Sequence, residues 1–345
     1  MAVYYWCPDD DRPYGGVRAI YRHVDILNAN GVPAFVLHER SPFRCSWFAN
    51  NTPVAYRALG PRLPMPATAA RTLRRARRTI GLEPEATIRL GSEDVLAVPE
   101  TMAFSEMEFA SGVPKVIFNQ GAYVTFRNWP PEIDFEHSPY GSPDVLAVLT
   151  TSVDGQRYLR VAFPELRVLR ARYSVDPTLF HGESEKESLV AFMPRKNRDS
   201  SKQVLLQLDL RGALAGWEVV AIDRMSETEV AEVLNRSSVF LSFGHPEGFG
   251  LPPLEAMRCG CIVIGYHGMG GREYFGPPRA LPIPFGDITL YVETVERVLG
   301  AFQRDPEPLL VRAREAARFV ADEYSPEREV DEVLRAWREI LGWRR

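Results

Sequence analysis

Two short apolar runs separated by a glycine loop constrain the fold of this chain more than any other feature. The runs, residues 239–243 and 261–264, are of the kind found in a parallel sheet that is buried on both faces. Between them, Gly248 and Gly250 permit backbone conformations that a Cβ would forbid, and two consecutive prolines fit a first helical turn. The pattern predicts a strand, a tight loop, a helix that begins near Leu251, and a second strand.

The start of this predicted helix has the properties of a phosphate site. Its first amides and its positive dipole end face the carboxyl edge of the sheet, where ligands bind in open α/β folds. Glu247 and Glu255 bracket it, and carboxylates accept hydrogen bonds from sugar hydroxyls. A ligand that carries both a phosphate and a polyol, such as a nucleotide sugar, would use both features. The candidate donor-binding residues are Gly248, Phe249, Gly250, Leu251 and Glu255, with His245 just before them.

Residues 247–264 also carry a recognisable motif, Glu-Gly-Phe-Gly-Leu-Pro-x-Leu-Glu-Ala-Met-x-x-Gly-x-x-Val-Ile. It resembles the donor-site signature of family 4 retaining glycosyltransferases of GT-B fold. The resemblance implies an α/β protein with two doubly wound Rossmann-like domains facing each other across a cleft. It implies metal-independent transfer of a sugar from a nucleotide sugar to an acceptor hydroxyl, with Glu247 holding the sugar and Glu255 the ribose. The alternative is that Glu247 caps a turn and Glu255 favours a helix N-terminus.

Bulk composition sets outer limits on fold and partners. A chain of 345 residues exceeds what one hydrophobic core usually organises, so we expect two α/β domains. The formal charge of −4 disfavours duplex nucleic acid as a partner. No apolar run approaches the roughly 20 residues that span a bilayer, and no basic segment precedes the first apolar run, so we expect a cytoplasmic protein. The four cysteines lack the spacing of a zinc site or a disulfide framework.

The amino-terminal half begins with another strand, loop, helix and strand. We predict strands at residues 2–6 and 33–38, with a helix from about Gly16 that stops at Gly31. Gly15 and Gly16 lie at the turn, and the segment resembles the amino-terminal glycine loop of the same glycosyltransferase family. Both glycines are therefore candidate donor-binding residues.

Further alternation of strands and helices makes this half, residues 1–172, a doubly wound domain. We predict strands at 95–98, 115–118 and 145–149 and helices at 102–110 and 153–161. Asn119, Gln120 and Tyr123 follow a strand end and are candidates for the sugar or acceptor side. Many members of the resembled family have a histidine in this region, whereas amides form hydrogen bonds but do not titrate.

We place the domain boundary at about 172 to 187 and a nucleotide-sugar-binding domain at 187–325. Its first predicted strand, residues 188–193, leads to a cationic loop and a helix. In the resembled family an arginine and a lysine at this point clamp the diphosphate of the donor, and Arg195 and Lys202 are the best matches. Lys196 or Arg198 are alternatives. The last helix, about 326–345, is expected to pack back on the first domain, as GT-B enzymes commonly arrange it.

Two charged segments have competing interpretations. Residues 9–11, Asp-Asp-Asp, suggest either a metal site or a solvated turn, and we favour the turn and no metal. The predicted helix 67–80 carries five arginines, which indicate either a solvated face or contact with anionic lipid at the inner face of a membrane. They are Arg71, Arg74, Arg75, Arg77 and Arg78.

The resemblance therefore predicts a glycosyltransferase of polysaccharide or glycoconjugate synthesis, with a nucleotide sugar as co-substrate and a sugar or lipid-linked acceptor. Two other functions stay open. One is a nucleotide-sugar epimerase of the same fold, which would need general acids and bases at the sugar carbon. The other is a binding module that has lost catalysis, suggested by the missing first-domain histidine.

Overall fold

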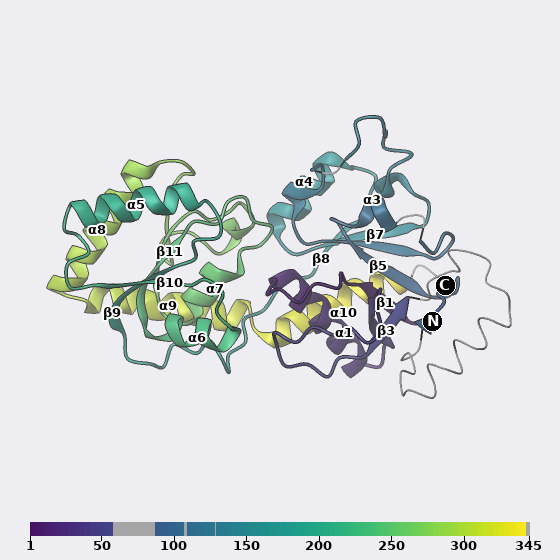
Figure 1. Cartoon of the computed structure of the whole chain (residues 1–345), viewed down its shortest axis with the longest axis horizontal. Coiled ribbons are helices and arrows are strands. Elements are labelled where there is room, and N and C mark those ends of the chain that lie inside the picture. Colours follow the sequence, from purple (N-terminus) through teal and green to yellow (C-terminus); the bar gives the residue numbers. More distant parts are fainter. Residues whose placement is uncertain (58–86, 107–108, 128, 343–345) are drawn as a thin grey trace. The chain divides into compact units, whose positions relative to one another are not determined.

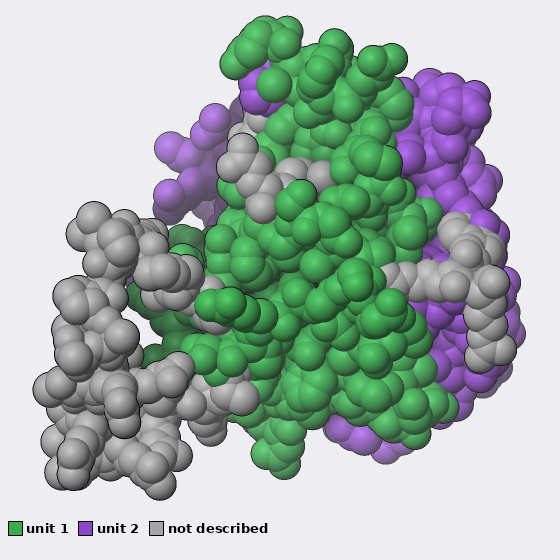
Figure 2. All heavy atoms as spheres, turned by 90° about the vertical axis from the view of Figure 1, so that its right-hand side faces the viewer, with its two compact units in different colours: residues 1–118, 131–147 green, residues 119–130, 148–345 purple. Residues whose placement is uncertain are grey.

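A computed structural model describes residues 1–57, 87–106, 109–127 and 129–342. These residues form two compact units (Figure 2). Unit 1 comprises residues 1–118 and 131–147, and unit 2 comprises residues 119–130 and 148–345. The predicted arginine-rich helix 67–80 lies outside the described residues. No described helix is long and apolar enough to cross a membrane.

The first sheet is parallel wherever its pairing is recorded. Among the described residues its strands follow the order β4-β3-β2-β1-β5-β6-β7-β8 (Figure 1). Their bounds are β1 Val3–Trp6, β2 Ala34–His38, β3 Val54–Arg57, β4 Thr87–Ile88, β5 Val95–Pro99, β6 Lys115–Asn119, β7 Val145–Thr150 and β8 Val168–Arg170. The predicted strands are confirmed. β3 was not predicted, and β4 and β8 are too short for an alternation pattern to develop.

Two α-helices of unit 1 differ in how well the sequence predicts them. α1 (Gly15–Ala29) matches its prediction, because one apolar face packs against β2. Among the described residues α3 covers Ala103–Glu106, and residues 109–110 are in a turn, so the predicted helix 102–110 is too long. Glu106 at its end is buried beside Arg57, with 3.1 Å between Oε2 and Nη1. Short 3₁₀ turns follow β6 and precede β7.

Unit 2 contains a five-stranded parallel sheet in the order β10-β9-β11-β12-β13. Its strands are β9 Glu187–Phe192, β10 Glu218–Ala221, β11 Ser237–Ser242, β12 Ile262–Gly265 and β13 Leu281–Pro282. Figure 1 shows α5 and α8 together on one face and α6, α7 and α9 on the other. The helices are α4 Val153–Ala162, α5 Arg198–Leu210, α6 Glu227–Arg236, α7 Leu251–Arg258, α8 Ile288–Arg304, α9 Glu307–Glu323 and α10 Pro326–Gly342.

Burial explains why β11 occupies the centre of this sheet. All six of its residues are buried, and Val239 and Leu241 pack with Val204 of α5 and Val295 of α8. Each such aliphatic side chain contributes about 1.5–3 kcal/mol relative to an exposed one. Its apolar centre, residues 239–241, is the part of the pattern that predicted it, and the hydroxyls of its three buried serines donate to backbone carbonyls.

The division into units differs from the boundary expected from sequence. β7 enters unit 2 after Ala147, so α4 and β8 belong to the same unit as the five-stranded sheet. α10 contacts β8, the last strand of the first sheet, and buries Trp337. The boundary at 172–187 and the assignment of domains remain predictions.

A fully buried histidine gives unit 1 a defined pH dependence. Burial, followed by the charge of Arg22, lowers the pKa of His23 from 6.5 to about 3, while its Nδ1 lies 3.0 Å from the Tyr5 hydroxyl. His23 therefore binds a proton near pH 6.5 in the unfolded chain, whereas in the folded chain it stays neutral until the pH falls to about 3. This stability is present above pH 6.5 and is lost as the pH falls toward 3.

We expect the free energy of unfolding to fall by about 1–2 kcal/mol between pH 6.5 and 5 through His23. Urea unfolding at the two pH values measures the change. His23→Asn, which retains an acceptor for Tyr5, removes this share of the pH dependence. An equal pH slope in the variant and the wild type would contradict the assignment.

Candidate functional site

The loop between β11 and α7 has the predicted form. The strand ends at Ser242, and α7 begins at Leu251 with two prolines in its first turn. Gly250 precedes the helix with φ +89°, a conformation that residues with a Cβ rarely adopt. Because Pro252 and Pro253 carry no N–H, the amides at this end without a partner in the helix are those of Gly250 and Leu251, in a position of the kind described for phosphates.

Three backbone segments meet at this loop without side chains between them. A Cβ on Gly248 would lie 1.9 Å from the carbonyl oxygen of Gln120, and a Cβ on Gly270 would lie 2.0 Å from that of Gly248. The Tyr274 hydroxyl donates to the carbonyls of Gly250 and Phe249, the latter at 3.2 Å. The structure thus brings together Gln120 and Gly248, two residues predicted separately for the acceptor and donor sides.

Glu247 is held by its backbone and paired through its carboxylate. Its amide donates to the carbonyl of Gly268 at 2.7 Å, and its carbonyl accepts from the amide of Gly270 at 3.1 Å. The carboxylate forms an ion pair with Lys196 Nζ, and the absence of a side chain at Gly244 leaves room for it. Because the lysine side chain is half exposed, the pair contributes at most about 1 kcal/mol.

The other predicted donor residues occupy two environments. Glu255 lies in α7 and is buried. Arg195 and Lys202 are exposed, the first in the loop after β9 and the second in α5. Asn197 joins this loop to the β11–α7 loop, since its Nδ2 donates to the carbonyls of Phe243 at 2.7 Å and His245 at 2.9 Å. The cationic loop and the glutamate loop are therefore fixed together.

Each residue predicted for the acceptor side is hydrogen-bonded to another side chain of unit 2. Asn119 is fully buried, and its Nδ2 donates to Thr125 Oγ1 at 2.8 Å. Gln120 accepts a hydrogen bond from the hydroxyl of Tyr173 at 2.5 Å. The Tyr123 hydroxyl donates to Asp154 at 2.5 Å, and burial, followed by this bond, raises the pKa of Tyr123.

Gly15 and Gly16 form the first turn of α1 in unit 1. In the same unit, two of the aspartates 9–11 accept hydrogen bonds from segments more than thirty residues away, rather than from within a local turn. Asp9 accepts from the amide of Arg40 at 2.9 Å, and Asp11 from that of Ser46 at 2.6 Å. In the described part of the chain no three His, Cys, Asp or Glu side chains group together as metal ligands would.

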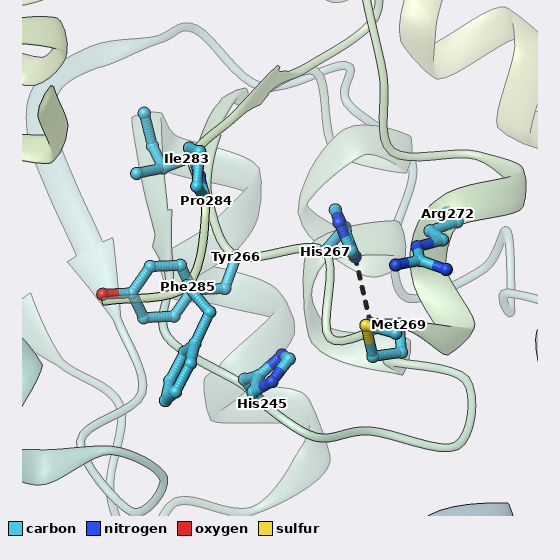
Figure 3. Close-up of a pocket in the computed structure, with 8 residues that line it drawn as sticks. All are labelled: His245, Tyr266, His267, Met269, Arg272, Ile283, Pro284 and Phe285. Atoms are coloured by element: carbon cyan, nitrogen blue, oxygen red, sulfur yellow. Dashed lines mark hydrogen bonds between the residues drawn. The ribbon is translucent and has the colours of Figure 1, made fainter. Parts of the chain in front are cut away.

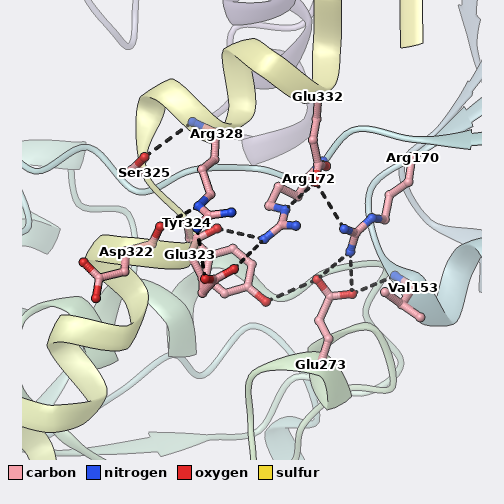
Figure 4. Close-up of polar contacts among 10 residues, drawn as sticks. All are labelled: Val153, Arg170, Arg172, Glu273, Asp322, Glu323, Tyr324, Ser325, Arg328 and Glu332. Carbon is pink, nitrogen blue, oxygen red and sulfur yellow. Dashed lines mark hydrogen bonds and ion pairs between the residues drawn. The ribbon is translucent and has the colours of Figure 1, made fainter. Parts of the chain in front are cut away.

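Glu273 is at the centre of a polar network that links distant parts of unit 2 (Figure 4). Its carboxylate accepts from the amide of Val153 at the start of α4 (2.7 Å), from Arg170 of β8 (3.3 Å) and from the Tyr324 hydroxyl after α9 (3.2 Å). Burial raises the pKa of Glu273, and these donors oppose that shift. Glu332 of α10 extends the network by accepting from both Arg170 and Arg172.

Sequence reasoning missed several residues that hold the site in place. Asn197 has φ +51°, an infrequent conformation for a residue other than glycine, and nothing in the sequence reveals its two carbonyl partners. Tyr274 directly follows the single 3₁₀ turn Gly270–Glu273, and no sequence pattern predicts that its hydroxyl bonds the start of α7.

Comparison with known proteins supports the fold and part of the sequence signature. Residues 203–318 match the family model of glycosyl transferases group 1. An alpha-1,6-glucosyltransferase of Actinobacillus pleuropneumoniae serotype 7 is 45% identical over 125 residues, which cover 35% of this chain and 38% of that protein. The chain spans about a third of the length of the curated relatives that it matches.

Solved structures match over almost the whole chain at low sequence identity. Sucrose-phosphate synthase from Thermosynechococcus elongatus has a TM-score of 0.67 and 13% identity, with 99% of both chains covered. The Anabaena protein HepE in complex with UDP and glucose has a TM-score of 0.64 and 13% identity, also with 99% of both chains covered. The chain therefore has the GT-B fold, with two α/β domains built on parallel sheets, as predicted.

A methyl group at Gly248 tests the close approach to Gln120. We expect Gly248→Ala to destabilise the protein by about 1–3 kcal/mol, because two backbone segments must separate to accommodate it. Thermal or urea unfolding measures the change. Gly276→Ala is the matched control, since a Cβ there meets no atom within 4 Å and the backbone is not in the left-handed region. Equal stability of the two variants would contradict the packing described.

Proposed function

We propose that this chain is a glycosyltransferase that moves a sugar from a nucleotide-sugar donor to an acceptor hydroxyl. The observation that carries the proposal is the amino-terminal end of α7, an anion site with Glu247 in the loop before it and Glu255 within the helix. The same loop contacts the backbone of Gln120 through Gly248. The match of residues 203–318 to glycosyl transferases group 1 covers this loop and supports the same activity.

The comparisons suggest which donor to test first. HepE was solved with UDP and glucose, and the relative from Actinobacillus is named as a glucosyltransferase. UDP-glucose is accordingly our first candidate donor. We propose that Glu255 binds the ribose, that Glu247 binds hydroxyls of the transferred sugar, and that the amides of residues 248–251 contact the diphosphate. Gly15 and Gly16, in the first turn of α1, stay candidate donor-binding residues.

The chemistry requires the bond between sugar C1 and the diphosphate oxygen to break. Negative charge then develops on the leaving nucleoside diphosphate. Arg195, Lys202 and the positive end of α7 would stabilise it without a metal ion. Lys196 pairs with Glu247, so we assign the clamp first to Arg195 and Lys202, with Arg198 as the alternative. We propose retention of configuration through attack on the same face of the sugar, with no carboxylate nucleophile assigned.

The acceptor hydroxyl would approach from the side of Gln120 and Tyr123. Gln120 lies against the donor loop through its carbonyl, and Tyr123 is positioned by Asp154. Closure of the site around both substrates would exclude water, whose attack on the donor is the competing reaction.

Purified protein incubated with UDP, GDP, dTDP and ADP sugars, each with and without EDTA, tests the activity. We expect release of UDP from UDP-glucose, at the same rate when EDTA is present. Loss of release on chelation would overturn the metal-independent mechanism. Epimerised donor without nucleotide release would point to an epimerase, and tight binding with neither reaction would point to a binding module.

We expect substitutions of the two glutamates to differ in their effects on donor affinity and on turnover. We expect Glu255→Ala to weaken donor binding, measured by calorimetry, by roughly tenfold or more, since it removes a buried acceptor for ribose hydroxyls. We expect Glu247→Ala to lower kcat more than affinity, because the sugar is held less well as its bond breaks. Glu293→Ala, an exposed glutamate in α8, is the control. Equal loss of both parameters in both site variants would count against these roles.

A further inference from the structure

A small pocket in unit 2 has no role in the function proposed so far. It has a volume of about 240 Å³ and is lined by loops that follow β11, β12 and β13 (Figure 3). Its walls include His245, Tyr266, His267, Met269, Arg272 and Phe285. Because the three strands are parallel, these loops lie at the carboxyl edge of the sheet, as does the Glu247 loop.

One wall of the pocket is an aromatic platform. The rings of His245 and Phe285 stack with centroids 4.0 Å apart and an interplanar angle of 18°. Tyr266 supports Phe285 edge-on at 5.2 Å and is itself buried. Phe285 is 55% exposed, an unusual exposure for a phenylalanine. An aromatic face that is backed on one side and open on the other suits the C–H-rich face of a sugar ring.

Another part of the pocket offers hydrogen-bond donors. His267 Nδ1 accepts from the amide of Met269 at 3.0 Å, so the neutral ring carries its proton on Nε2. Arg272 Nη1 donates to Asp154 at 3.3 Å, and its half-exposed guanidinium has further N–H groups for a ligand. Burial, followed by the nearby charge of Arg272, lowers the pKa of both His245 and His267, so both rings are neutral at pH 7.

The pocket shares a wall with the proposed sugar site. The loop that carries His267 and Met269 is hydrogen-bonded along the backbone to Glu247, through the carbonyl of Gly268 and the amide of Gly270. His245 is two residues from Glu247 in the chain. The pocket and the Glu247 loop are therefore neighbours at the carboxyl edge of the sheet, while the Glu247 carboxylate itself pairs with Lys196.

Size selects among ligands. Pockets for drug-sized molecules measure roughly 300–1,000 Å³, and this pocket is smaller. Its volume suits a group of about the size of a single sugar ring. We propose that the pocket is an acceptor subsite that binds one pyranose ring, stacked on the face of Phe285 that His245 does not cover and hydrogen-bonded by His267 and Arg272. The term acceptor rests on the proposed glycosyltransferase function; the binding of a pyranose ring does not.

Binding of methyl pyranosides tests the subsite directly. Saturation-transfer NMR with methyl glucoside, galactoside, mannoside, N-acetylglucosaminide and glucuronide, each with and without UDP, reports contact with the protein. We expect at least one to bind wild-type protein, and we expect Phe285→Ala to weaken that binding by roughly tenfold. Phe285→Trp, which retains an aromatic face, should keep it. Phe135→Ala, a change at another exposed phenylalanine, should have no effect.

Separate measurements distinguish the possible failures. No bound pyranoside, or equal binding to Phe285→Ala, would overturn the subsite, whether or not UDP-glucose is cleaved. If Phe285→Ala weakens UDP-glucose binding but not UDP binding, the pocket holds the donor's sugar and the acceptor assignment is wrong. Thermal unfolding of each variant shows that the fold is intact. Pyranoside binding without any nucleotide-sugar turnover would leave the subsite standing and contradict the proposed function.

Discussion

The candidate site depends on one steric condition, the approach of backbone to backbone at Gly248. A carbonyl oxygen of Gln120 occupies the space that a side chain at 248 would need, and the carbonyl of Gly248 does the same at Gly270. The first turn of α7, the loop after β6 and the loop after β12 can meet only because both positions lack a Cβ. This contact joins the loop proposed to bind the donor to the segment proposed for the acceptor side.

The parts of this arrangement that the sequence could predict are those governed by local physics. The centre of β11 is an apolar run, and the start of α7 is marked by Gly250 and two prolines, so both were predicted closely. The predicted extent of α3 was wrong, because an apolar spacing that fits a helix does not show where the tertiary contacts that stabilise the helix end. Strands as short as β4, β8 and β13 hold their places through pairing with neighbours, which no local pattern encodes.

The site was predictable in its residue types and only partly in its connections. Glu247 and Glu255 stand in a recognisable string, but the ion pair between Glu247 and Lys196 joins segments about fifty residues apart. Two further contacts depend on the packed backbone in the same way: the bonds from Asn197 to two carbonyls, and the hydrogen bond that the Tyr173 hydroxyl donates to Gln120. Long-range partners of this kind are set by the fold. Sequence analysis can therefore propose binding residues, but not the contacts that position them.

The network around Glu273 has a consequence for how such a protein can be divided. A cut between residues 172 and 187 would leave Arg170 and Arg172 in one fragment and their partners Glu273 and Glu332 in the other. Chimaeras that exchange the carboxyl-terminal half alone would then set guanidinium groups against an unrelated surface, with their charges poorly compensated. A workable exchange unit would carry β8 and the start of α4 together with α10. Exchange of segments between relatives is therefore constrained by ion pairs that join Arg170 and Arg172 to Glu273 and Glu332, more than a hundred residues further along the chain.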